Sequence, residues 1–62
     1  MKRRDFIRKI EAAGWTFVTE GGDHTKYVKR SRTFPVPRHN EVSSGVVGSW
    51  EKINRQIDEE DK

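Results

Sequence analysis

The sequence contains no cysteine, which excludes a disulfide framework and a metal site built from thiolates. It has no apolar run approaching the ~18 residues needed to cross a bilayer, and no signal peptide is visible. It also lacks a Gly-Lys-Ser/Thr phosphate-binding loop and a serine or cysteine nucleophile arrangement. These absences predict a soluble, cytoplasmic protein without membrane contact, and a chain of 62 residues leaves no room for a deep cofactor cavity.

Hydrophobic residues are scarce, at 31% against 37% charged residues, and the mean hydropathy of −1.03 is close to that of disordered chains. Two Trp, three Phe and one Tyr nevertheless fall at periodic positions, as in a folded chain. We expect a single domain over residues 1–62, with its core in about residues 2–57. The acidic residues 58–62 are expected to be a frayed, solvated tail.

Charge is distributed unevenly along the chain. Residues 1–40 carry ten basic and four acidic side chains, whereas residues 41–62 carry three basic and six acidic ones. The segment from His24 to Arg38 contains five Lys or Arg residues and no acidic residue. Such a local excess attracts polyanions, chiefly nucleic acid, although many small soluble proteins are rich in Lys and Arg.

Two segments have the apolar spacing of a helix. The first covers residues 2–13, and Gly14 is the left-handed stop expected just past its end. The second follows Ser43 or Ser44, either of which can cap it. The two apolar stripes comprise Phe6, Ile10 and Ala13, and then Val46, Trp50, Ile53 and Ile57.

Aromatic and β-branched residues between the two helices predict three strands. These strands cover residues 15–20, 24–30 and 33–37, with a turn at residues 21–23. Because the loops are short, the strands should form an antiparallel meander. The predicted fold class is therefore α+β, in the order α-β-β-β-α, with both helices on one face of the sheet and the other face open.

Pro35 and Pro37 place the third strand at an edge of the sheet, because both missing N–H donors fall on the same side of it. A two-residue loop at residues 31–32 would pair the second and third strands so that His24 faces His39. Strand addition at the proline-containing edge is then not expected.

Alternation along the strands assigns side chains to the two faces. The core face should carry Tyr27, Phe34 and Val36, and a three-residue loop at residues 21–23 would add Trp15 and Phe17 to it. A two-residue loop would instead turn Trp15 and Phe17 outward. The open face should carry His24, Lys26, Arg30, Pro35, Pro37 and His39, beside an apolar strip of Val18 and Val28.

His24 is the strongest candidate for chemistry. Imidazole transfers protons near neutral pH, and RNA supplies its own nucleophile, the 2′-hydroxyl group. His24 could be the base, a neighbouring cation could stabilise the phosphate, and His39 could protonate the leaving oxygen. The non-catalytic alternative is that His24 ends the turn and only forms hydrogen bonds with neighbouring residues. A metal site is not expected. The expected RNA contacts are Gly22, Lys26, Arg30, Arg32, Arg38 and His39.

Several short motifs, in this order and spacing, resemble the HicA family, the toxins of bacterial HicAB toxin–antitoxin systems. They are Gly14-Trp15, Gly21-Gly22-Asp23-His24 followed by Lys26-Tyr27, Val36-Pro37-Arg38-His39 and Gly45-Val46-Val47. The resemblance covers about residues 2–57. Many members have Gly-Ser-His-His where this chain has Gly-Gly-Asp-His, and their last helix is richer in Leu and Ile.

The resemblance implies a fold like that of double-stranded-RNA-binding domains and the activity of an mRNA interferase, an endoribonuclease that arrests growth. It implies one catalytic histidine on the second strand, which corresponds to His24. It also implies a HicB-like antitoxin that covers the active site, and operator DNA bound only through the complex of the two proteins.

Two other functions remain open from the sequence. A non-catalytic double-stranded-RNA-binding module would share the order of elements, but such modules have a lysine cluster at the start of the last helix. Here residues 41–45 read Glu-Val-Ser-Ser-Gly, which counts against that function. A protein-interaction domain, whose open face binds another protein, is the second alternative.

Overall fold

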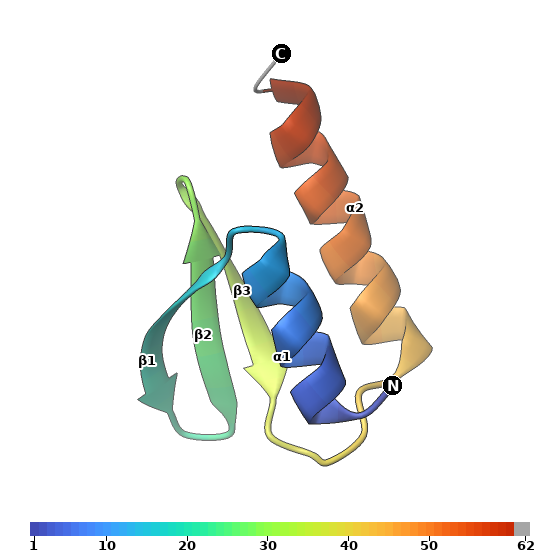
Figure 1. Ribbon diagram of the computed structural model, residues 1–62. Helices are drawn as coiled ribbons and strands as arrows, with labels where there is room; N and C mark the ends of the chain where they lie inside the picture. Colours follow the sequence, from blue (N-terminus) through green and yellow to red (C-terminus); the bar gives the residue numbers. More distant parts are fainter. Residues whose placement is uncertain (61–62) are drawn as a thin grey trace.

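A computed structural model describes residues 1–60 of the chain. One helix precedes and one helix follows a three-stranded antiparallel sheet of order β1-β2-β3. This arrangement confirms the predicted α+β meander. Figure 1 shows the strands on one side of the molecule, α1 next to them, and α2 alongside α1. The elements are α1 (Arg3–Ala12), β1 (Thr16–Gly21), β2 (His24–Lys29), β3 (Arg32–Pro37) and α2 (Ser44–Glu60). Within residues 1–60, neither helix combines the length and hydropathy that a membrane span requires.

The first helix forms because its apolar residues recur on one face. Phe6 and Ile10 are fully buried, as their spacing predicts. The chain leaves the helix at Gly14, whose φ of 97° lies in the left-handed region that glycine adopts without strain. The Trp15 N–H then donates to the Ile10 carbonyl at 3.0 Å, which closes the end of the helix.

The last helix begins with a side-chain cap. The Val46 N–H donates to the Ser43 hydroxyl oxygen at 3.3 Å, so Ser43 is the capping residue. The helix continues to Glu60, so residues 58–60 of the expected tail are helical, with exposed side chains. Two ion pairs with the β2–β3 hairpin account for the longer helix: Lys29–Asp58 at 3.6 Å and Arg32–Glu60 at 2.8 Å. The remainder of the predicted tail, residues 61–62, lies outside the described residues.

The core lies between the helices and one face of the sheet. Tyr27, Phe34 and Val36 form the strand side of this core, as alternation predicts. The Phe6 ring meets the Trp50 ring edge-on, with 5.8 Å between centroids. Such aromatic pairs each contribute about 0.5–1.5 kcal/mol beyond their buried area. Both helices therefore cover the same face and leave the other face open.

The register between β2 and β3 differs from the predicted one by two residues. His24 pairs with Pro37, and the two-residue turn is Arg30-Ser31. Arg30 has a φ of 57°, so the chain reverses one residue earlier than expected. A shift of two residues keeps the side chains within β2 and β3 on their predicted faces, and β3 remains an edge strand. Arg30 and His39, which were also expected on the open face, lie outside the strands. The predicted opposition of His24 and His39 is nevertheless wrong.

The turn between β1 and β2 is also shorter than predicted. Gly21 pairs with His24, which leaves a two-residue turn of Gly22 and Asp23 instead of three residues. A bulge between Phe17 and Thr19 compensates, so that Phe17 still pairs with Tyr27 on the helix-covered face. Trp15 is buried as predicted, but Phe17 is 56% exposed because β1 lies at the sheet edge beyond the helices.

Candidate functional site

A hollow at one end of the sheet brings His24 together with other predicted site residues. We call it the His24 hollow, and its lining is Gly22, Asp23, His24, Pro37, Arg38 and His39. It lies where the β1–β2 turn meets the end of β3. The tight turn at Gly22 and the register that pairs His24 with Pro37 place these segments next to each other.

His24 lies on the open face of the sheet. Its neighbour Thr25 is 3% exposed and faces the helices, as does Tyr27, so alternation places His24 and Lys26 on the opposite side. The side chains of His24 and His39 are both exposed to solvent. A polynucleotide can therefore reach the imidazole without any movement of the helices.

Arg38 fixes the two walls of the His24 hollow relative to each other. Its guanidinium donates to the Gly22 carbonyl at 3.1 Å and lies 3.9 Å from the Glu20 carboxylate. The side chain is still half exposed, and a guanidinium has five N–H donors. Arg38 can thus hold the glycine turn in place and still offer donors to a phosphate group.

Arg3 supports the hollow from the helix side, and the sequence analysis missed it. Its Nε donates to the Pro37 carbonyl and its Nη2 to the Thr25 hydroxyl, both at 2.9 Å. Arg3 thereby ties α1 to the two strand segments that carry His24 and Arg38. A signal was present, because Arg3 shares the helical face of Phe6 and Ile10.

Two predicted contacts lie away from the His24 hollow. Arg30 is in the β2–β3 turn, about 20 Å along the strand from His24 at ~3.3 Å per residue. Arg32 pairs with Lys29 and faces the helices, where it donates to Gln56 and Glu60. Arg32 stays a predicted RNA contact, but its guanidinium is engaged by α2 in this structure. Alternation could not reveal it, because its partners come from α2.

The family model of the HicA toxins of bacterial toxin–antitoxin systems matches residues 3–54. The match runs from the start of α1 into α2 and includes the whole His24 hollow. The chain belongs to the HicA toxin family. No curated protein and no solved structure matches the chain.

The side chains that line the His24 hollow determine what chemistry this HicA chain can perform there. An exposed imidazole can accept and donate a proton at neutral pH, and Arg38 adds a positive charge beside it. Lys26 lies two residues further along the same face. Tyr27 takes no part, because it faces the helices; burial there raises its pKa, and the Glu11 carboxylate adds to the rise. Among residues 1–60, no three His, Asp or Glu side chains come together as a metal site.

Proposed function

We propose that this HicA protein is an endoribonuclease toxin, an mRNA interferase that acts on RNA in the cytoplasm and uses His24 as its catalytic residue. The observation that carries this proposal is the exposed imidazole in a hollow shared with Arg38 and His39, on the face that also carries Lys26. Membership of the HicA toxin family supports the same function.

The proposed reaction uses the 2′-hydroxyl of the RNA as its nucleophile. His24 accepts the 2′-hydroxyl proton, and the oxygen attacks the adjacent phosphorus while the bond from phosphorus to the 5′-oxygen breaks. A 2′,3′-cyclic phosphate and a 5′-hydroxyl result. His39 lines the same hollow and supplies the proton to the leaving oxygen. Arg38 and Lys26 stabilise the charge on the phosphate, and the exposed Gly22 lets the backbone approach closely.

His24→Ala is the first test of this function. The side chain is exposed, so the variant should fold like the parent. RNA cleavage should fall at least about 100-fold, because positioned acid–base groups commonly contribute that much. Cleavage of a defined RNA is measured in the presence of a chelator, with analysis of the product ends and of growth arrest on induction.

The matched control is Thr33→Ala, an exposed strand residue at the other end of the sheet. It should keep the parent rate and the cyclic-phosphate product. A His24→Ala protein that still cleaves RNA and arrests growth would exclude the catalytic assignment. A parent protein that binds RNA and never cleaves it would instead favour the non-catalytic RNA-binding module.

The proposed partner is a HicB-like antitoxin that shields the site. Val18 is 49% exposed and Phe17 is 56% exposed on β1, and the cations of the open face lie nearby. An acidic antitoxin segment could cover both surfaces and block His24 by coverage alone. Operator DNA would be bound only through the resulting complex. The prolines of β3 make strand addition at that edge unfavourable.

A further inference from the structure

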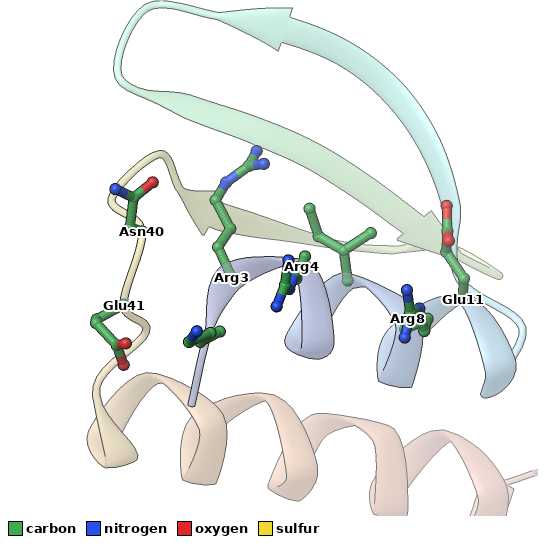
Figure 2. A pocket seen from close by; sticks show the side chains of 8 residues that line it. Arg3, Arg4, Arg8, Glu11, Asn40 and Glu41 are labelled. Carbon is green, nitrogen blue, oxygen red and sulfur yellow. The ribbon is translucent and has the colours of Figure 1, made fainter.

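A second basic hollow lies between the start of α1 and the loop that follows β3. Its lining includes Lys2, Arg3, Arg4, Arg8, Glu11 and Glu41. Figure 2 shows Arg4 and Arg8 on the same side of α1, with Arg3 directed toward the sheet. Because Arg3 is already bonded to Pro37 and Thr25, the cations available here are Lys2, Arg4 and Arg8, which we call the α1 cations.

The α1 cations have no carboxylate partner within residues 1–60, where none of the three makes an ion pair or a side-chain hydrogen bond. Other basic residues of the fold do: Lys9 pairs with Glu51, and Arg32 with Glu60. The nearby Glu41 carboxylate lies 3.7 Å from the α-amino nitrogen of Met1 instead. The Glu11 carboxylate also lines the hollow, but the four basic residues there outnumber the two carboxylates, so the hollow keeps a positive excess.

Two features of these residues are unfavourable for the free helix, although Arg8 also lies three residues from Asp5 and from Glu11. Lys2 and Arg4 lie at the positive end of the α1 dipole, where cations are unfavourable. Arg4 and Arg8 are also four residues apart, a spacing at which like charges repel. A bound anion would relieve both effects, so the arrangement suits an anionic ligand better than it suits the free helix.

The loop after β3 connects the second hollow to the His24 hollow. Arg38 and His39 line the first, and the next two residues of the same loop, Asn40 and Glu41, line the second. The loop is held against α1, because the Arg3 N–H donates to the Asn40 carbonyl at 2.8 Å and Lys2 forms a β-bridge with Glu41. A nucleic-acid strand that leaves the His24 hollow past His39 therefore meets the α1 cations next.

We propose that Lys2, Arg4 and Arg8 form a second phosphate-binding site, which holds the RNA strand on one side of the bond cleaved beside His24. This inference rests on the proposed function for its ligand. It assigns α1 a role in RNA binding that is separate from the chemistry, and it predicts that affinity rises with RNA length once the strand spans both hollows.

The test is the Arg4→Gln/Arg8→Gln double variant, compared with a Lys52→Gln/Arg55→Gln control. Both pairs are exposed on a helix, and both changes remove two positive charges. The ligands are fluorescent 2′-O-methyl oligouridines of about six and about eighteen nucleotides, lengths that bracket common single-strand site sizes. They carry no free 2′-hydroxyl, so binding is measured whether or not His24 cleaves RNA, and thermal melts confirm folding.

The Arg4→Gln/Arg8→Gln variant should bind the long oligonucleotide about tenfold more weakly and the short one like the parent. The slope of log affinity against log salt should fall by about 1.4 for the long ligand, since each phosphate contact to a single strand contributes about 0.7. The control should change both values less. Equal losses in the two variants, or parent values for the long ligand, would overturn the site. Parent RNA binding with lost affinity for a HicB-like antitoxin would also overturn it and would make the α1 cations a protein-binding surface.

Discussion

Three arginine side chains in and around the candidate site make different contacts, although they are of the same residue type. Arg38 links the glycine turn to the loop after β3, whereas Arg3 joins α1 to β2 and β3 from the buried side. Arg32 connects the hairpin to α2. Residue type alone therefore does not identify the RNA contacts, and the location of each guanidinium decides its role.

Arg3→Met should destabilise the protein by about 2 kcal/mol. Methionine keeps much of the apolar stem but removes both donors, which leaves the buried Thr25 hydroxyl without its Arg3 donor. For a chain of this size the melting midpoint should fall by roughly 10 °C. Arg55→Met, at an exposed position on α2, is the matched control and should shift the midpoint little. A midpoint equal to that of the parent would show that the two Arg3 bonds contribute nothing net.

At the level of elements, the sequence predicts the order of helices and strands well because apolar spacing reports it directly. Phe6 and Ile10, and likewise Trp50 and Ile57, are buried on the expected helical faces. Turn lengths were predicted less well. The left-handed Arg30 and the bulge after Phe17 carry no distinctive sequence signal. The β2–β3 register therefore differs from expectation throughout, and the β1–β2 register differs beyond the bulge.

The difference between spacing, which the sequence reports, and turn length, which it does not, also decides which part of the candidate site is predictable. Alternation depends only on parity, so it placed His24 and Lys26 on the open face despite the two-residue register shift. The alignment of His24 with Pro37 depended on the turn and was not predicted correctly. The contacts of Arg32 with α2 depend on how the helix crosses the hairpin, which short-range patterns do not report.

Two glycines next to or within the helices should respond in opposite directions to the same substitution. Gly14→Ala places a side chain at a φ of 97°, and its Cβ would lie 3.4 Å from the Lys29 side chain. The free energy of unfolding should fall by about 1–2 kcal/mol. Gly48→Ala lies within α2 with nothing within 4 Å of the new Cβ, and it should add about 1 kcal/mol. Urea denaturation measures both changes. Equal shifts in the two variants would contradict the backbone argument.

Across the whole molecule, the two edges of the sheet differ in what they offer a partner. The β3 edge carries Pro35 and Pro37, which cannot donate to another strand. The β1 edge lies away from α2, is exposed along its whole length, and carries Phe17 and Val18 (Figure 1). The proposed antitoxin is therefore expected to contact the β1 side, from which it can extend over the turn at Gly22 to His24.

Val18→Asp tests this docking side directly. The residue is 49% exposed at the β1 bulge, so the free protein should remain folded. In the complex, a carboxylate would be buried against an apolar or acidic surface, and affinity for the HicB-like antitoxin should fall at least about tenfold. Val18→Thr, which keeps the β-branched shape, is the control and should lose less. Calorimetric titration gives both affinities, and RNA cleavage at saturating antitoxin reports coverage of the site. If Val18→Asp binds as tightly as the parent, the antitoxin must reach His24 from another side of the fold.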